Sequence, residues 1–258
     1  MYDYCTVQTA GHVLTVTIDR PEVMNALHFA ANFELAQVFD QFDADPDLWV
    51  AILTGAGDRA FCAGLDLKSL DPDRPLPKDP PSGFGGLTHR FTSSKPIIAA
   101  VNGVAAGGGF EIALACDLIV ASETAFFTLP EARVGLVPMA GGMHRLTRQI
   151  GLKLGMGMLL TGRRVSAQEA LDLGFVNEVV PGGELMRAAH RWADDIQKCA
   201  PLSVRASKAC VMQGSKHGSV QAAITAHYDA VDEMLQSEDL REGLSAFQEK
   251  RRPQWRGR

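Results

Sequence analysis

The chain has 258 residues, of which 46% are hydrophobic and 21% are charged. A chain of this length buries about 75% of the surface that it exposes when unfolded, so disorder is excluded as the main state and one large domain, with or without an appendage, is predicted. With 25 Lys and Arg against 30 Asp and Glu the net charge is -5, which gives no general field to attract nucleic acid or anionic lipid.

The cysteines and the N-terminus indicate the cellular compartment of the protein. The five cysteines are odd in number, far apart and without a C-x-x-C pair, which predicts a reducing environment and no metal site. No basic segment followed by an apolar run opens the chain, so we predict a cytoplasmic protein. The most apolar stretch, residues 97–121, is interrupted by Asn102, Glu111 and Asp117, so a membrane span is not predicted.

The first half of the chain alternates predicted strands and helices. Residues 13–18 and 49–54 have the composition of strands, and residues 29–42 between them carry Phe29, Phe33, Ala36 and Phe39 at helical spacing. Residues 97–121 predict a strand, a turn, a buried helix and a further strand. This alternation predicts parallel strands with crossover helices, hence an α/β layer architecture.

Residues 71–86 have no regular pattern. Their prolines exclude a helix or a strand ladder and predict a mobile surface loop. Two interpretations of this loop stay open, an inert insertion and a lid over a site. The prolines are Pro72, Pro75, Pro77, Pro80 and Pro81.

After about Gly141 the chain is predicted to be mostly helical. Ser166 and Glu169 have the spacing of a capping box, and Gly174 is a typical residue to end the helix that they begin. A strand is predicted over residues 175–180. The predicted helices cover residues 143–150, 154–160, 167–173, 185–199, 202–212, 220–235 and 240–250.

A glycine loop follows the second predicted strand. Gly55, Gly57 and Ala60 match the loose form of the dinucleotide-binding fingerprint. That fingerprint requires a helix to follow, but residues 60–64 predict a second short strand and a turn. We therefore do not predict an NAD site.

A second glycine run precedes an apolar helix. Gly107, Gly108 and Gly109 leave no side chain over the free N–H groups of that helix, so a ligand oxygen could approach the backbone directly. Close packing of backbone against backbone is the alternative.

Glu111 lies on this helix, which is apolar on every face, so its carboxylate is predicted to be buried and functional. Glu131 follows Pro130 in an irregular stretch. By itself it would be a surface glutamate, or one paired with Arg133, and only proximity to Glu111 would give it a function.

Ordered motifs over most of the chain resemble the crotonase (enoyl-CoA hydratase/isomerase) superfamily. They lie at residues 20–21, 25–27, 60–68, 95–117, 129–131, 141–142, 161–163 and 242–251. The resemblance implies a crotonase-like spiral of repeated β-β-α units over residues 1–195, followed by a helical region at 196–258 that closes the CoA pocket and forms a homotrimer or homohexamer.

The resemblance also implies a reaction. The backbone N–H groups of Leu65 and Gly108 would bind a thioester oxygen, and Glu111 and Glu131 would hold the water that adds to a 2-enoyl-CoA. Retention of both acids favours a hydratase, in which Glu111 activates water and Glu131 protonates C2. CoA would enter as part of the substrate, without a separate cofactor. The implied substrate-binding and CoA-binding residues are Met24, Ala63, Leu65, Asp66, Leu67, Lys68, Phe84, Gly108, Phe247 and Lys250.

Some motifs resemble a subgroup that dehydrates carnitinyl-CoA, whose acyl chain carries a trimethylammonium group. They lie at residues 83–88, 108–111, 161–164 and 250–258. Phe84 would attract that cation through its aromatic ring. Two features depart from the subgroup: residues 71–81 do not follow its pattern, and Met139 stands where it has an acid.

Phe247 and Lys250 match positions that reach the CoA nucleotide of a neighbouring subunit, where a cation could meet a phosphate. The other cations of the C-terminal tail could also form a solvated surface or a small RNA-binding patch. Two functions remain as alternatives: an enoyl-CoA isomerase that uses one glutamate, and a catalytically silent protein that binds acyl-CoA or RNA. Cys62 is interpreted as a buried hydrophobic residue and not as a nucleophile, because no histidine motif accompanies it.

Overall fold

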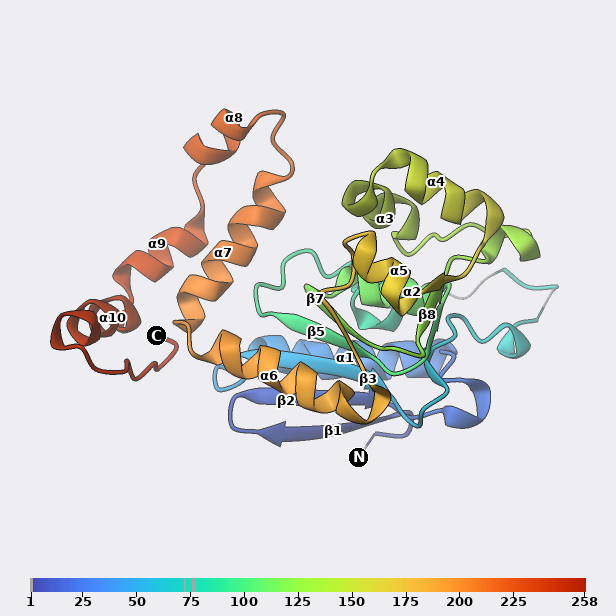
Figure 1. The fold of residues 1–258 in the computed structure, drawn as a ribbon, viewed down its shortest axis with the longest axis horizontal. Helices are drawn as coiled ribbons and strands as arrows, with labels where there is room; N and C mark the ends of the chain where they lie inside the picture. Colours follow the sequence, from blue (N-terminus) through green and yellow to red (C-terminus); the bar gives the residue numbers. More distant parts are fainter. Residues whose placement is uncertain (1, 72, 76–77) are drawn as a thin grey trace.

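The computed structural model describes residues 2–71, 73–75 and 78–258. Its strands form two sheets (Figure 1). The larger sheet has the order β1 (Cys5–Ala10), β2 (Val13–Ile18), β3 (Val50–Gly55), β5 (Ile97–Val101), β7 (Leu118–Ser122) and β10 (Glu178–Val180). The smaller sheet has the order β4 (Ala60–Cys62), β6 (Val104–Ala106), β8 (Phe126–Thr128) and β9 (Val165–Ser166).

The chain passes repeatedly from one sheet to the other. β3, β5 and β7 lie in the larger sheet, and each is followed by β4, β6 or β8 in the smaller one; α2 (Gly108–Ala115) follows β6. Within the larger sheet only β1 and β2 pair antiparallel, and the other pairs are parallel. The predicted α/β architecture with its spiral of β-β-α units is therefore confirmed.

The larger sheet is buried on both faces. Along β3, Ala51 and Leu53 face the main core, which holds α1 (Phe29–Ala44) and α2, while Ile52 faces the opposite side. That side is covered by α6 (Leu185–Gln197). A strand covered on both faces has apolar residues in unbroken runs, which explains the short apolar strands of the sequence.

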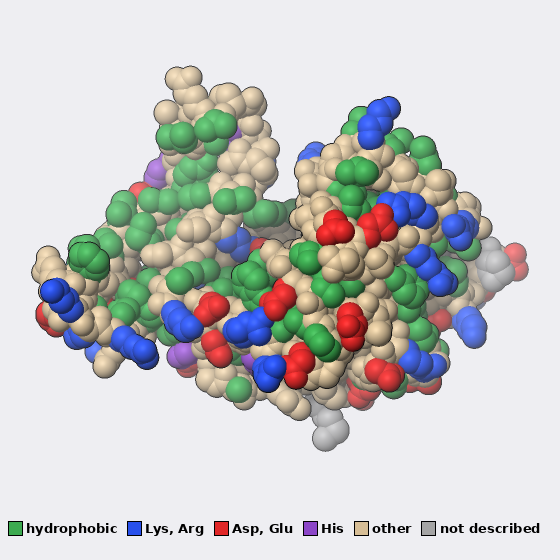
Figure 2. Space-filling view, viewed as in Figure 1, with side chains coloured by type: hydrophobic (Ala, Val, Ile, Leu, Met, Phe, Trp, Pro, Cys, Tyr) green, Lys and Arg blue, Asp and Glu red, His purple; other side chains and the backbone are tan. Residues whose placement is uncertain are grey.

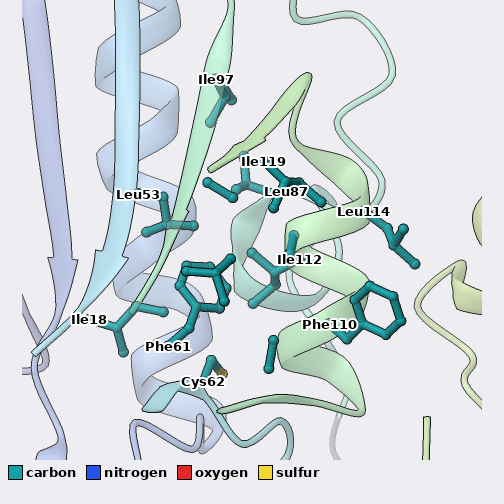
Figure 3. Close-up of a cluster of buried hydrophobic side chains, with 14 of the residues drawn as sticks. Ile18, Leu53, Phe61, Cys62, Leu87, Ile97, Phe110, Ile112, Leu114 and Ile119 are labelled. Atoms are coloured by element: carbon teal, nitrogen blue, oxygen red, sulfur yellow. The ribbon is translucent and has the colours of Figure 1, made fainter. Parts of the chain in front are cut away.

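Helix α2 is a central element of the main core. Of the α2 side chains Phe110, Ile112 and Leu114, Ile112 points towards Phe61 of β4, and the other two point to the opposite side of the helix (Figure 3). All three side chains are at most 3% exposed. Burial of this kind contributes roughly 1.5–3 kcal/mol for each large apolar side chain, so the helix is firmly held in place.

Two asparagines fix the passage from β3 to β4. The buried Asn25 donates from Nδ2 to the carbonyls of Ala56 and Ala60, at 3.0 and 2.7 Å, and Asn102 donates to the carbonyls of Gly55 and Ala60 at 2.9 and 3.1 Å. The chain leaves the larger sheet here, so its carbonyls need other partners. The segment that follows β4 starts from a fixed position as a result.

Most predicted helices are confirmed, with one difference in α1. Its buried face is formed by Leu35, Val38, Phe39 and neighbours, whereas Phe29 and Phe33 are exposed. The confirmed helices of the second half are α3 (Gly142–Ile150), α4 (Leu152–Thr161), α5 (Ala167–Asp172), α6, α7 (Pro201–Gly214) and α10 (Glu238–Glu249). The cap of α5 is also confirmed, since Glu169 N donates to Ser166 Oγ at 3.2 Å.

The prediction of one helix over residues 220–235 is wrong. The structure has two, α8 (Val220–Thr225) and α9 (Asp229–Gln236), with extended backbone at Ala226 and Tyr228 between them. The Tyr228 hydroxyl donates to the carbonyl of Ala223 at 2.7 Å. That carbonyl also accepts from Ala226 N at 3.4 Å, but the bond from residue 227 that a continuing helix would add is missing, and the tyrosine hydroxyl takes its place.

The prediction of an irregular surface segment over residues 71–86 is wrong at its end. Phe84–Gly86 forms a 3-10 turn, and all three residues are buried against α1. Gly85 N donates to Asn32 Oδ1 of α1 at 2.6 Å. The predicted positions Pro72 and Pro77 lie outside the described residues.

Helices α7 to α10 stand to one side of the sheets (Figure 1). The tail after α10 folds back on this group, because the buried Asp239 accepts from the backbone N–H groups of Arg256 and Gly257 at 2.7 and 2.8 Å. Trp255 Nε1 donates to the carbonyl of Lys198 at 2.8 Å. In the part of the chain that the structure describes, no helix is long and apolar enough to cross a membrane.

Candidate active site

The site is built where the segment after β4 meets the first turn of α2. Gly64 has φ +91°, and a side-chain carbon at this position would lie 2.7 Å from Ala106 O and 2.9 Å from Gly108 N. Both distances are too short for any Cβ, so only glycine permits this approach. The contact brings the backbone of Leu65 beside that of Gly108.

The N–H groups of Leu65 and Gly108 are available to a ligand. Neither donates to an acceptor within residues 2–71, 73–75 and 78–258, although the next N–H, that of Asp66, donates to Leu27 O at 3.0 Å. Leu65 and Gly108 line one cavity of about 140 Å³.

The two interpretations of the glycine run therefore hold at different residues. Gly109 packs against the carbonyl of Cys62, whereas Gly108 faces the cavity and the ring of Phe84. Close packing accounts for Gly109, and an open N–H accounts for Gly108.

Glu111 reaches the same cavity from α2. The residue is only 3% exposed, and its Oε1 accepts from Gly142 N at 2.7 Å. The pKa of the Glu111 carboxyl is raised to about 7, chiefly by burial and also by the nearby charge of Glu131, while the bond from Gly142 and the charge of Arg145 oppose this. A carboxyl in this state can exchange a proton near neutral pH.

Glu131 joins this cavity from the 3-10 turn Glu131–Val134. Its Oε2 is buried and has no hydrogen-bond partner among the described residues, and burial raises the pKa of its carboxyl. The alternative of a pair with Arg133 is wrong, because that guanidinium donates to the carbonyl of Thr161 instead, at 2.9 Å from Nη2. An unpartnered buried carboxylate oxygen needs an occupant of the cavity as its partner.

The rest of the cavity is mostly apolar. Phe84, which the family resemblance implicated, is on its wall, and so is Met139. Some wall residues were not singled out as functional by sequence reasoning, since nothing in their local pattern marks them. These are Asn32, Lys78, Asp79, Leu136, Val137 and Ala140, together with Phe29, whose helical spacing suggested only a core position.

The predicted CoA-binding residues after β4 lie along one short segment. Ala63 N donates to Met24 O at 3.0 Å, which holds these two residues together. The Asp66 carboxylate is buried and paired with Arg20 at 3.2 Å, so it stabilises the segment. Leu67 and Lys68 follow in the turn Leu67–Ser69 and are exposed.

Phe247 and Lys250 are not brought to this cavity. Both lie at the C-terminal end of α10, among the helices that stand apart from α2 and β8 (Figure 1). Phe247 is 84% exposed.

Cys62 is completely buried beside Gly64, and burial raises the pKa of its thiol to about 12. A thiol in this state is not a nucleophile at neutral pH, which confirms its interpretation as a buried hydrophobic residue. Within the described ranges, no group of three or more His, Cys, Asp or Glu side chains is arranged to hold a metal ion.

The family follows from comparison with known proteins. A model of the family described as enoyl-CoA hydratase/isomerase matches residues 8–258. The chain belongs to this family. Among curated relatives, the carnitinyl-CoA dehydratase of Proteus mirabilis is 45% identical over 257 residues, covering 97% of each chain. The carnitinyl-CoA dehydratase of Salmonella typhi is 44% identical over 255 residues, covering 96% of each chain.

Solved structures of the same family share the fold of this chain. A probable enoyl-CoA hydratase/isomerase from Mycobacterium abscessus has a TM-score of 0.91 and 38% identity, with 100% of both chains covered. The enoyl-CoA hydratase from Bacillus anthracis has a TM-score of 0.90 and 33% identity, with 99% of this chain and 100% of that chain covered.

The raised pKa of Glu111 predicts a pH dependence of stability. Between its ordinary value of 4.5 and about 7, the unfolded chain releases this proton more readily than the folded one, so this carboxyl stabilises the fold less as the pH rises. We compare the free energies of unfolding of Glu111→Gln and of the wild type. As the pH rises from 4.5 to 8, this difference should change in favour of the variant by on the order of 3 kcal/mol. Urea unfolding at a series of pH values measures this difference.

The matched control is Met139→Leu, which changes the same cavity without removing a titratable group. Its stability should follow the pH dependence of the wild type. If the stability of Glu111→Gln also has the pH dependence of the wild type, the buried carboxyl is ionised throughout this range and the prediction is wrong.

Proposed function

We propose that this protein is a hydro-lyase that adds water reversibly to 2-enoyl-CoA and, in reverse, dehydrates 3-hydroxyacyl-CoA. The observation that carries the proposal is the meeting of four groups in one cavity: the N–H groups of Leu65 and Gly108 and the carboxyls of Glu111 and Glu131. Membership of the enoyl-CoA hydratase/isomerase family supports the same reaction.

The two N–H groups would form the oxyanion hole. Water adds to C3 of the conjugated thioester, and negative charge develops on the thioester oxygen as an enolate forms. Two donors held in place by the protein stabilise that charge without reorganisation, and such a donor contributes a factor of roughly 10² to 10³ in kcat. The glycines Gly64 and Gly108 keep side chains away from this point.

The two carboxyls would handle the water and its proton. In hydration, Glu111 would accept a proton from the water as its oxygen bonds to C3, and Glu131 would donate a proton to C2. Burial of both groups supports proton transfer by this pair, because it raises both pKa values and makes exchange near neutral pH possible. Addition of water changes no oxidation state, so we propose no cofactor beyond the CoA of the substrate.

Removal of either acid tests this assignment. We expect Glu111→Gln and Glu131→Gln each to lower kcat by at least ~10²-fold, the scale of a lost general acid or base, while acyl-CoA binding is retained. Loss of the 2-enoyl thioester absorbance reports turnover, and calorimetry with a saturated acyl-CoA reports binding.

Near-normal turnover in one variant would remove that residue from the mechanism. The isomerase alternative would be favoured if Glu131→Gln isomerised a 3-enoyl-CoA while it hydrated 2-enoyl-CoA only slowly. A wild-type protein that binds acyl-CoA or RNA but leaves every 2-enoyl-CoA unchanged would establish a silent binder and overturn the proposal.

The oxyanion hole is tested through Gly64. We expect Gly64→Ala to lower kcat by roughly 10²-fold or more, because the new Cβ would push the Leu65 segment away from Gly108 and misplace one donor. The matched control is Gly57→Ala, since Gly57 also has a positive φ but nothing lies within 4 Å of its added carbon. Equal kinetic effects of the two variants would contradict the assignment.

For the acyl chain, we propose a trimethylammonium group like that of carnitinyl-CoA. The relatives named carnitinyl-CoA dehydratase, at 44% and 45% identity, support this substrate. Phe84 and Asp79 support it chemically, since an aromatic face and a carboxylate on one cavity wall both attract a cation. In the subgroup an acid stands at the position of Met139. We propose that Asp79 supplies the negative charge of that acid here.

A comparison of matched substrates tests this specificity. We expect kcat/KM for dehydration of carnitinyl-CoA to exceed that for its neutral tert-butyl isostere by about tenfold or more, the scale of a partly desolvated cation–π contact. Asp79→Asn should reduce this preference, whereas Asp73→Asn, which changes an acid outside the cavity, should preserve it. Equal rates for the two substrates would remove the cation from the proposal.

We propose that the protein assembles as a homotrimer or homohexamer through its C-terminal helices. Support comes from hydrophobic side chains that gather on the surface of these helices (Figure 2). Val220 and Ile224 on α8 are each 76% exposed. In such an assembly Phe247 and Lys250 would reach the CoA bound by a neighbouring subunit.

Disruption of this surface tests the assembly. We expect Ile224→Asp to yield a smaller species in analytical ultracentrifugation and to raise KM for acyl-CoA, because each pocket would lose its neighbour. Thr9→Asp, a charge added to an exposed position on β1, is the control and should leave the mass unchanged. A wild-type protein that sediments as a monomer would contradict the proposal.

A further inference from the structure

Arg145 on α3 is a half-buried cation without a carboxylate partner among the described residues. Its Nη2 donates to Thr88 O at 2.7 Å and its Nη1 to Ala140 O at 3.3 Å, and its guanidinium lies over the ring of Phe91, with Cζ 5.5 Å from the ring centroid. Desolvation of a guanidinium is costly and is normally offset by an ion pair. The charge of Arg145 therefore remains free to act on groups nearby.

The carbonyl that Arg145 binds belongs to the turn that holds Glu111. Ala140 precedes Gly141, which has φ +108°, and Gly142, whose N–H donates to Glu111 Oε1. The second donor of Arg145 ties this turn to residue 88, in the segment that follows Phe84–Gly86. The guanidinium thus joins the wall residue Ala140 to the segment that follows Phe84–Gly86, and it fixes the position from which Gly142 reaches Glu111.

The charges around Glu111 come from separate elements. Glu131 on its 3-10 turn raises the pKa of Glu111, and Arg145 on α3 lowers it. Lys78 and Asp79 lie on the same cavity wall from the segment before Phe84. On the side of Arg145, the neighbouring groups are the partly buried thiol of Cys116 and the ring of Phe91, which stacks on His89.

We propose that Arg145 is a positioning residue for Glu111: it fixes the turn at residues 138–142 that binds the carboxylate, and its charge favours the ionised form that must accept a proton from water. This role rests on the proposed hydratase function for its kinetic consequence. The link between Arg145 and the ionisation of Glu111 is a property of the fold and can be measured without turnover.

Two variants separate the charge of Arg145 from its geometry. Arg145→Gln removes the charge, so the titration of Glu111, followed by the infrared carboxyl band that Glu111→Gln abolishes, should move up by about one pH unit. Because Glu111 must be ionised to activate water, the rise of kcat/KM for hydration with pH should move up by the same amount. Arg145→Lys keeps the charge but loses the planar fork to two carbonyls, so kcat should fall while the titration stays near that of the wild type.

The control is Arg148→Gln on the same helix, an exposed arginine whose Nη1 donates to His144 O, and it should change neither quantity. An unchanged Glu111 titration in Arg145→Gln would overturn the proposal, even if the variant were less stable. If Arg145→Gln does not fold, Arg145→Lys still tests the proposal. A Glu111 titration in Arg145→Lys that moved up by about one pH unit would overturn it, and one near that of the wild type would support it. A shifted titration in a protein without hydratase activity would uphold the role of Arg145 and reject the proposed function.

Discussion

The candidate site depends on one close contact, the approach of Gly64 to the first turn of α2. At this point the ends of β4 and β6 bring two backbone segments so close that a single Cβ would collide with Ala106 and Gly108. The contact aligns two N–H groups from different parts of the chain, one in the segment after β4 and one in the first turn of α2. It also explains why residue 64 is a glycine, since any side chain there would keep the two segments apart.

The two-sheet spiral holds this contact in place. β4 must leave the larger sheet at a fixed point, and the amides of Asn25 and Asn102 satisfy the carbonyls exposed by that departure. Helix α2 is fixed from the other side by apolar residues packed against both sheets. The donors are therefore held by the most buried part of the protein, which limits the reorganisation needed when charge develops on a bound thioester.

The surroundings of the two acids are less regular than the backbone around the N–H donors. Glu111 is on the rigid α2, but the N–H group that binds it belongs to a glycine turn, and Glu131 lies on a 3-10 turn. The glycine turn beside Glu111 is held in part by the long-range bond of Arg145 to the carbonyl of Thr88.

Much of the architecture could be predicted from the sequence, because strands buried on both faces leave apolar runs and α2 leaves an apolar stretch with one carboxylate. A functional role for Glu111 could be proposed in the same way, since burial of a charged acid is costly, whereas the glycine run also allowed close backbone packing and Gly108 was assigned as a donor only through the family resemblance. Local patterns also failed in identifiable places. At the break between α8 and α9 a tyrosine hydroxyl bonds a helix carbonyl, and the burial of Phe84–Gly86 depends on α1, whose Asn32 binds Gly85 across 53 residues of the chain.

By itself the sequence determined the fold class, the family resemblance and the glycine and carboxylate positions, because these depend on periodicity and residue type. Only the tertiary structure decided that Glu131 faces the cavity instead of pairing with Arg133, that Arg145 supports the turn beside Glu111, and that Asp79 lies on the wall near Met139. The physical reason is that these placements depend on segments distant in the chain: Arg133 binds Thr161, Arg145 binds Thr88, and Gly142 binds Glu111. Their energy comes from burial and from hydrogen bonds that exist only after the sheets have packed.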